Sequence, residues 1–496
     1  MSSPDHDTVI VGAGFSGIGA AIALDRSGLG DYLVLEAGDD VGGTWYWNTY
    51  PGIAVDIPSF SYQFSFEQST EWSRTYAPGR ELAAYAAHCV DKYGLRPKIR
   101  LSTTVLRADY EENQQLWRIT TESDGRRDSI TARFLINAGG VLTVPKLPDI
   151  AGVDSFSGPT VHTARWDHDL DLRGKRVGII GTGASAVQVI PEIAPIVERL
   201  TVFQRTPIWC FPKFDVPLRS TARTLMRLPL GRTVQRLLSQ LYVELTFPLP
   251  AQYFTLNPMA KRMADAGRAY LRREVKDPAT RDKLTPRYAV GCKRPGFHNT
   301  YLSTFNRDNV ELVTDTIEAI TETGVATADG ARHELDVLIL ATGFQVMDTD
   351  SMTFPIHGRD GRSLAQFWTE HRLQAYEGVS IPGFPNFFTV FGPYGYVGSS
   401  YFALIEAQTH HIVRCLRAAE QRRATRIEVR QEANDRFFAE MMRKRHRQIF
   451  WQDSCRHANS YYFDANGDVP LRPASTLEAY WRSRRFPIDD YEFAAG

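Results

Sequence analysis

One short pattern occurs twice in the chain: a β-branched run, closely spaced glycines, and a helix-forming stretch. GAGFSG at residues 12–17 joins residues 9–11 to 18–24, and GTGASA at residues 181–186 joins residues 177–180 to 187–193. Glycine allows the tight turn from strand to helix and lets the backbone approach a pyrophosphate at the helix N-terminus. The pattern therefore predicts an α/β chain with two dinucleotide sites. We assign to them Gly12, Gly14, Ser16 and Gly17 for the first and Gly181, Thr182, Gly183, Ser185, Ala186 and Gln188 for the second.

The second strand of each unit ends near a residue of opposite charge. Glu36 follows Gly12 by 24 positions, and Arg205 follows Gly181 by the same 24 positions. A carboxylate here accepts hydrogen bonds from ribose hydroxyls, whereas a guanidinium binds a 2′-phosphate that a carboxylate would repel. The first site is therefore predicted to bind FAD or NAD and the second NADPH, with a hydroxyl contact from Thr206. Without the matching spacing, Arg205 would be taken for an ordinary solvated arginine.

Two dinucleotide sites in one chain imply electron transfer between two cofactors, and NADPH reducing a bound flavin is the simplest arrangement. Disulfide reductases share this arrangement, but they need a cysteine pair near the first helix, and the first cysteine here is Cys89. That class is set aside. The predicted fold class is α/β, with two Rossmann-like dinucleotide-binding domains and a helical insert.

Composition excludes several other classes. The chain has 496 residues, enough for about three domains, and its 57 basic and 57 acidic residues cancel, which argues against nucleic-acid binding. No apolar run reaches membrane-spanning length, and the polar N-terminal residues lack the parts of a secretory signal. We expect a cytoplasmic protein without stable membrane insertion.

The five cysteines are widely spaced, with 40 positions between the closest two, Cys415 and Cys455. No CxxC or zinc-ligand spacing occurs, so we expect no metal site. An odd number of scattered cysteines predicts reduced thiols.

The linker between the two units carries a longer motif. Residues 156–167 read FSGPTVHTARWD and fit the pattern FxGxxxHxxxW followed by Pro or Asp. With this motif the chain resembles the type I Baeyer–Villiger monooxygenases, which use FAD, NADPH and O2; related flavin-containing and N-hydroxylating monooxygenases usually have Tyr or Phe in place of Trp166. The residues alone indicate a hydrogen-bonded linker histidine at His162. The resemblance also implies a conformational role for His162 and Trp166.

An aromatic, glycine- and proline-rich stretch at residues 42–56 resembles the family's flavin-lining segment. Flat rings in an ordered loop can pack against a planar group or simply form a local hydrophobic core. From the residues alone, Asp56 would be a turn or capping residue. The resemblance implies instead that Asp56 is an active-site aspartate. The family often has Arg where this chain has Thr49, and Arg-Cys where it has Ala54-Val55. The FAD contacts implied are Thr44, Trp45, Tyr46, Trp47, Asp56, Tyr62, Val105 and Tyr401.

Residues 292–295, CKRP, resemble the family's Lys-Arg segment. The resemblance implies that Arg294 is catalytic, paired with Asp56, and that Lys293 contacts the 2′-phosphate of NADP. A permanent guanidinium can stabilise a flavin peroxide anion and a tetrahedral oxyanion. Composition alone would favour a solvated pair in a loop. Tyr461 stands where many members have a Trp that contacts the nicotinamide ribose, so we expect a NADP contact there, with a core aromatic as the alternative.

The resemblance implies an enzyme in which NADPH reduces FAD, O2 forms a C4a-peroxyflavin, and one oxygen is inserted next to a ketone carbonyl to give an ester or lactone. The alternative within oxygenases is a flavin monooxygenase that oxygenates N or S atoms. A non-catalytic nucleotide-binding or redox-sensing protein is the rival from another class. The partners expected are a small-molecule ketone and O2, and the oligomeric state expected is a monomer or weak oligomer.

Domain limits follow from the apolar strands near residues 134–140 and 338–344, which end in small residues. They predict a discontinuous FAD-binding domain of residues 1–143 and 347–496, and a NADP-binding domain of residues 144–216 and 291–346. Residues 217–290 mix leucine and arginine at helical spacing and predict a helical subdomain. Its basic residues fit a solvated face, and contact of its apolar residues with a membrane surface or a hydrophobic substrate stays open.

Overall fold

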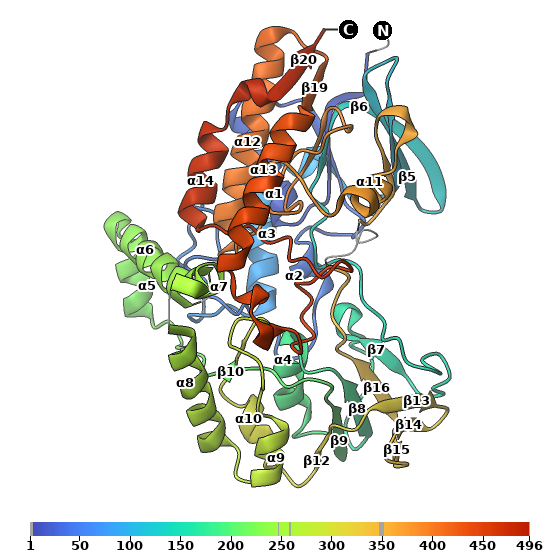
Figure 1. Cartoon of the computed structure of the whole chain (residues 1–496), viewed down its shortest axis with the longest axis vertical. Coiled ribbons are helices and arrows are strands. Elements are labelled where there is room, and N and C mark those ends of the chain that lie inside the picture. The colour runs from blue at the N-terminus through green and yellow to red at the C-terminus, as the bar shows by residue number, and fades with distance from the viewer. Residues whose placement is uncertain (1–2, 247, 257–258, 347–351, 496) are drawn as a thin grey trace.

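The chain folds into two lobes stacked along its long axis, each built on its own sheet (Figure 1). The computed structural model describes residues 3–246, 248–256, 259–346 and 352–495. The upper lobe in Figure 1 contains β5 and β6 and both chain ends, and the lower lobe contains β8, β9 and β16. The predicted α/β class with two Rossmann-like cores is confirmed.

The larger sheet has eight strands in the order β17-β4-β5-β6-β1-β2-β3, with β18 also paired to β6. Its centre is parallel, and β4 and β5 add an antiparallel meander beside β6. Val9 and Ile10 of β1 are fully buried because helices or chain cover both faces of the parallel part. The strands are β1 (His6–Val11), β2 (Tyr32–Leu35), β3 (Ile99–Arg100), β4 (Thr104–Glu111), β5 (Leu116–Ser123), β6 (Arg126–Asn137), β17 (Ile356–His357) and β18 (Phe387–Thr389).

The smaller sheet has five parallel strands in the order β12-β9-β8-β16-β7. These are β7 (Thr160–His162), β8 (Arg176–Ile180), β9 (Arg199–Phe203), β12 (Val310–Val313) and β16 (Val337–Leu340). Short sheets complete the fold: β10 (Cys210–Phe211) with β11 (Gly296–Phe297), β13 (Ile317–Thr321) with β14 (Gly324–Thr327) and β15 (Arg332–Glu334), and β19 (Arg426–Val429) with β20 (Tyr491–Ala494). The larger sheet takes strands from both sides of residues 160–340, which form the smaller one. This topology supports the proposed discontinuous FAD-binding domain on either side of the NADP-binding domain.

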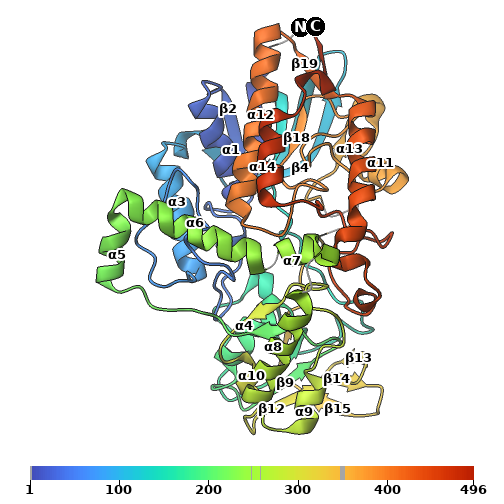
Figure 2. The ribbon, with the colours of Figure 1, turned by 60° about the vertical axis from the view of Figure 1, so that its left-hand side comes forward.

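In the upper lobe α12 packs on both α1 and α14 (Figures 1 and 2). The helices of the two lobes are α1 (Phe15–Arg26), α2 (Thr44–Trp47), α3 (Gly79–Lys92), α4 (Ala184–Ile193), α10 (Tyr301–Thr304), α11 (Leu364–His371), α12 (Tyr401–Arg422), α13 (Gln431–Lys444) and α14 (Thr476–Arg485).

Residues 217–290, expected to be helical, contain α5 (Ser220–Arg227), α6 (Pro229–Thr246), α7 (Pro248–Gln252), α8 (Met259–Glu274) and α9 (Pro278–Lys283). Pairing of β10 with β11 brings the two ends of this insert together. Helices α5 and α6 project from one side of the molecule in both ribbon views (Figures 1 and 2). In the part of the chain that the structure describes, no helix is long and apolar enough to cross a membrane.

The prediction of reduced thiols throughout is wrong for two cysteines. Cys292 and Cys455 form a disulfide, with their Cα atoms 5.1 Å apart, whereas Cys89, Cys210 and Cys415 are free and buried. The pair was missed because 163 positions separate its members, and only the tertiary fold brings them together. The disulfide ties the residue before Lys293 to the C-terminal segment.

Candidate active site

The first glycine turn closes tightly between β1 and α1. Gly12 has φ +100°, and a Cβ added there would lie 2.8 Å from the carbonyl oxygen of Ala138. A Cβ on Gly17 would lie 1.8 Å from the carbonyl oxygen of Gly12, so only glycine lets the helix approach the strand. Among the described residues no side chain caps α1, which leaves its first N–H groups for a phosphate.

Glu36 lies at the end of β2, beside this turn. Its Oε2 accepts a hydrogen bond from the backbone N–H of Ala13 (2.7 Å), and Oε1 accepts one from Gly38 (2.8 Å). The carboxylate is therefore held at the place where the sequence puts a ribose-binding group. Each oxygen keeps a second lone pair for a hydroxyl, and the ribose contact stays a prediction.

The second turn repeats this geometry between β8 and α4. Gly181 has φ +115°, and a Cβ there would lie 2.4 Å from the carbonyl oxygen of Ala341. Gly183 faces open space, with no heavy atom within 4 Å of an added Cβ, so its backbone is accessible to a ligand. No described side chain caps α4. Both turns therefore fit a dinucleotide pyrophosphate.

Two cations converge beyond the second turn. Burial and the charge of Arg205 lower the pKa of Lys293 to about 8. Like charges at such a place indicate a site for an anion, here the 2′-phosphate that the sequence predicts. The Thr182 hydroxyl donates to the carbonyl of Thr206 (2.9 Å), and the Asn459 amide donates to the Thr206 hydroxyl (2.7 Å). The C-terminal segment thus closes over the same turn.

Asp56 and Arg294 form a bidentate ion pair, although 238 positions separate them. Arg294 donates from Nε to Oδ2 (2.6 Å) and from Nη2 to Oδ1 (2.8 Å). Burial opposes ionisation of Asp56, but the charge and hydrogen bonds of Arg294, with help from Lys213, hold the pKa of Asp56 below its usual value. Asp56 in turn raises the pKa of Arg294 against its burial. The pair stays ionised at any working pH, and the fork is fixed in orientation.

The loop that carries Asp56 also joins the two lobes. The Tyr50 hydroxyl donates to Oε1 of Gln188 in α4 (3.0 Å), and Nε2 of Gln188 donates to the carbonyl of Ala54 (2.8 Å). Gln188 is buried, and these two contacts use its amide at both ends. The loop therefore has a defined position relative to the second site, and a NADP contact from Gln188 stays a prediction.

A group of tyrosines surrounds the Arg294 guanidinium. The Arg294 charge acts on Tyr62, Tyr396, Tyr401 and Tyr462, whose pKa values burial raises. Tyr396 and Tyr401 stack with ring centroids 5.0 Å apart. Tyr461 lies beside Tyr462 at a centroid distance of 4.5 Å and is 42% exposed, so the alternative of a buried core aromatic does not hold for it. The tyrosines that surround the Arg294–Asp56 pair thus form an aromatic environment around it.

The remaining flavin-side predictions fall in three places. Trp45 donates from its indole to the Tyr62 hydroxyl (3.2 Å), which places α2 beside the tyrosine group. Trp47 packs its ring against Tyr46 and under the guanidinium of Arg165. Val105 is buried in the core on one face of the larger sheet. Thr44 begins α2.

His162 and Trp166 occupy the linker at the edge of the smaller sheet. Nδ1 of His162 accepts from the N–H of Ala164 (3.1 Å), and its Nε2 lies 3.3 Å from the Thr342 hydroxyl. Burial lowers the pKa of His162, which favours the neutral ring. Trp166 packs against the core of the smaller sheet. The described contacts of His162 lie within the linker and the smaller sheet, and none of them joins it to Arg294.

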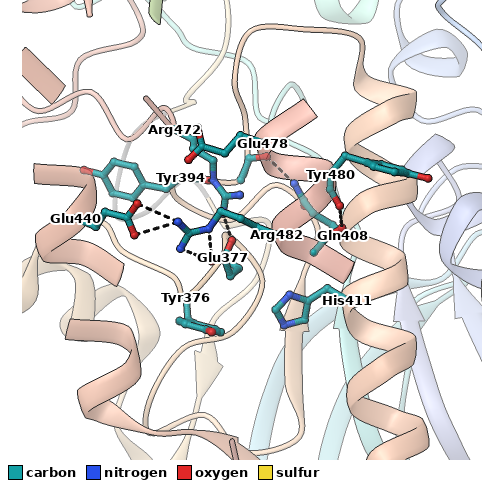
Figure 3. A network of polar contacts seen from close by, with 12 residues as sticks. Tyr376, Glu377, Tyr394, Gln408, His411, Glu440, Arg472, Glu478, Tyr480 and Arg482 are labelled. Atoms are coloured by element: carbon teal, nitrogen blue, oxygen red, sulfur yellow. Dashed lines mark hydrogen bonds and ion pairs between the residues drawn. The ribbon is translucent and has the colours of Figure 1, made fainter. Parts of the chain in front are cut away.

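A buried ion network braces the chain behind the tyrosine group (Figure 3). Glu377 accepts from Arg472 (2.8 Å) and Arg482 (2.8 Å), and Arg482 also pairs with Glu440. Arg472 donates to the carbonyl of Tyr394 (2.9 Å). The network therefore fixes the segment just before Tyr396 to α13 and α14.

Sequence reasoning missed Tyr396, Tyr462, Asn459 and Lys213 at this site. Lys213 is buried, and burial lowers its pKa despite the charges of Asp215 and Asp56. No spacing rule marks these residues. A lysine directly after the apolar residues 208–212, and the adjacent tyrosines at 461–462, were the available signals. Among the described residues, no group of three or more His, Cys, Asp or Glu could hold a metal ion.

Comparisons with known proteins agree with this arrangement. Residues 9–229 match the family described as pyridine nucleotide-disulphide oxidoreductase. A Baeyer-Villiger monooxygenase of Streptomyces coelicolor is 38% identical, over 97% of this chain and 92% of its own length. The solved structure of OTEMO in complex with FAD and NADP has a TM-score of 0.88 at 32% identity, covering 99% of this chain and 100% of that one. Oxidized steroid monooxygenase bound to NADP has a TM-score of 0.87 at 32% identity, covering 100% of both chains.

The two glycine turns, each on its own Rossmann-like sheet, define a protein with two dinucleotide-binding domains, and the similar solved structures are flavoprotein monooxygenases. The sequence identity to the curated relatives, and the share of both chains that it covers, are more specific. They show that the chain belongs to the Baeyer–Villiger monooxygenases. The resemblance seen in the linker motif is confirmed.

Proposed function

We propose that this protein is an FAD- and NADPH-dependent Baeyer–Villiger monooxygenase that converts a ketone and O2 into an ester or lactone. The observation that carries the proposal is the bidentate Asp56–Arg294 pair. It places a fixed cation among neutral aromatic rings, beside the segment that carries Lys293. Such a cation favours anionic oxygen.

When bound, FAD reduced by a hydride from NADPH would supply the electrons that activate O2. The first glycine turn with Glu36, and the loop from Thr44 to Asp56, would hold FAD. The second turn with Arg205, Thr206 and Lys293 would hold NADP. Uncapped helix N-termini and convergent cations are the groups that pyrophosphate and 2′-phosphate require.

Arg294 is proposed to stabilise negative charge and not to transfer a proton. Its raised pKa keeps it cationic, so it serves as a permanent donor to the oxygen that becomes negative when the ketone carbonyl is attacked. Asp56 holds the fork with two hydrogen bonds, which removes the reorganisation that a free arginine would need. The surrounding tyrosines carry raised pKa values, so they stay neutral and do not cancel the charge.

Tyr461 is proposed to contact the nicotinamide ribose, since it is exposed next to Tyr462 on the segment whose Asn459 reaches Thr206. A small-molecule substrate and O2 complete the reaction. A ketone substrate, a monomeric or weakly oligomeric state and a cytoplasmic location are parts of the same proposal.

The test is a screen of NADPH consumption with cyclic, aromatic and long-chain ketones, with product masses measured in parallel. The proposal expects at least one ketone to give a product heavier by one oxygen, without stoichiometric hydrogen peroxide. Purified protein that is colourless, or yellow and inert toward NADPH, would instead support a nucleotide-binding protein without oxygenase activity.

A further inference from the structure

Exposed apolar side chains gather on one face of the molecule. Fifteen large hydrophobic residues are exposed among those described, and ten of them lie on α6, on the residue before it, or on α14. Leu230 is 76% exposed, Leu237 68% and Leu477 77%. The apolar surface patch consists of Leu228, Leu230, Val234, Leu237, Leu238, Leu241 and Leu245, with Leu477, Tyr480 and Trp481 of α14. Clusters of this kind mark contact surfaces.

The patch follows helical spacing, so one face of α6 is apolar along its length. The opposite face is fixed to the body: Arg236 donates to the carbonyl of Gln63 (3.2 Å), Ser239 to the Ser61 hydroxyl (3.0 Å) and Gln240 to the Ser399 hydroxyl (3.0 Å). Rotation of α6 would break these bonds. The leucines therefore point outward as a property of the folded chain.

Helix α14 continues the same surface. Thr476 at its start hydrogen-bonds Glu244 near the end of α6. Arg484 lies over the Tyr480 ring, 4.4 Å from its centroid, and Arg485 over the Trp481 ring at 5.2 Å. Tryptophan and tyrosine beside arginine are the side chains that prefer the boundary between water and lipid.

The charge around the patch is mainly positive. Residues 216–243 contain five arginines and neither Asp nor Glu. Arg227 pairs with Glu71, on which Arg223 also acts, and Arg236 faces the body, which leaves Arg219 and Arg232. The nearby Glu244 turns inward to Gln240 and Ser399. The rim is therefore basic.

We propose that the apolar surface patch docks the protein peripherally on an anionic lipid bilayer, with the leucines of α6 and Trp481 in the interface and the arginines at the headgroups. A second copy of this chain fits less well, because a two-fold contact would bring basic rims together. The described helices do not span a membrane, and this attachment needs none to do so.

The test uses the FAD-loaded full chain and sedimentation with vesicles of phosphatidylcholine alone or with anionic phosphatidylglycerol. We expect binding at least tenfold stronger to the anionic vesicles and weaker at high salt. Leu237→Ser with Leu241→Ser should lower binding at least tenfold, and Arg484→Glu with Arg485→Glu should lower binding to anionic vesicles only. Leu147→Ser with Ile196→Ser is the matched control, since both residues are exposed but lie outside the patch.

Fluorescence gives a second readout that does not depend on sedimentation. Trp481 is the only exposed one among the nine tryptophans, all of which are described. Brominated lipid chains should quench its emission, and Trp481→Phe should remove most of that quenching. Equal binding by the leucine variant and the control variant would overturn the proposal. So would a wild-type dimer that the leucine variant dissociates while neither protein binds vesicles. Unchanged flavin content and melting temperature show that each variant is folded.

Discussion

The proposed NADP site makes cofactor choice depend on two neighbouring cations, Lys293 and Arg205. The perturbations are Lys293→Met and Arg205→Ala. A charge-assisted hydrogen bond is worth about 1.5–3 kcal/mol, which is roughly 10- to 150-fold in kcat/KM. NADH has no 2′-phosphate, so each variant should lower kcat/KM for NADPH by that factor and leave the value for NADH nearly unchanged.

The pH dependence sharpens this prediction. The pKa of Lys293 is lowered to about 8 by burial and by Arg205, so the ammonium is charged below pH 8 and is lost above it. The ratio of kcat/KM for NADPH to that for NADH should therefore fall as pH rises through about 8. Removing the charge of Arg205 should move this fall to higher pH, because it removes a like charge, and Lys293→Met should abolish it.

The assay is stopped-flow reduction of the flavin by NADPH and NADH at pH 6.5 to 9.5. The arrangement is refuted if either variant lowers kcat/KM for NADPH and for NADH by the same factor, since the cation would then not act on the 2′-phosphate. It is also refuted if the ratio is flat across pH in the wild-type protein. Arg199→Ala is a suitable control, because this arginine pairs with Glu311 on the surface of the same sheet.

Three further predictions concern the ion pair, the disulfide and the first turn. Asp56→Asn removes the charge that orients Arg294 and should lower ketone oxygenation roughly 30- to 150-fold, about 2–3 kcal/mol, while flavin reduction continues; equal losses in both steps would contradict this. Cys455→Ser opens a loop of 163 residues and should lower the free energy of unfolding by up to about 5 kcal/mol. Denaturant unfolding measures this loss, with Cys415→Ser as the control. A dithiol should destabilise the wild type but not the Cys455→Ser variant. Gly12→Ala places a Cβ 2.8 Å from a carbonyl oxygen at φ +100° and should reduce FAD content and cost about 1–3 kcal/mol; Gly94→Ala, with positive φ in open space, should retain FAD.

The sequence was sufficient for the parts of the fold that short-range patterns encode. Strand, glycine turn and helix follow one another within about twenty residues in such a unit, so both Rossmann-like cores were predictable, and Glu36 and Arg205 followed from equal spacing. Asp56 and Arg294 could be paired only through the family resemblance, because 238 positions separate them.

Other features depend on tertiary packing, which the sequence does not encode in short-range patterns. Cys292 and Cys455 meet because the C-terminal segment folds back onto the loop after the helical insert. Tyr396 reaches Arg294 because a buried network, with Arg472 bonded to Glu377 and to the Tyr394 carbonyl, holds its segment in place. The exposed face of α6 was visible as a leucine and arginine pattern, but only the contacts of Ser239 and its neighbours show which side faces outward.

The central claim is that Arg294 directs oxygen from O2 into a ketone. The direct measurement is turnover of a ketone under 18O2 by the wild type and by Arg294→Ala, with label traced by mass spectrometry and NADPH oxidation followed in parallel. We predict one 18O in the ester or lactone of the wild type, at the bridging oxygen, and flavin reduction without labelled ester in the variant. Labelled ester from Arg294→Ala would contradict the account, as would a wild type that labels only thioethers or amines.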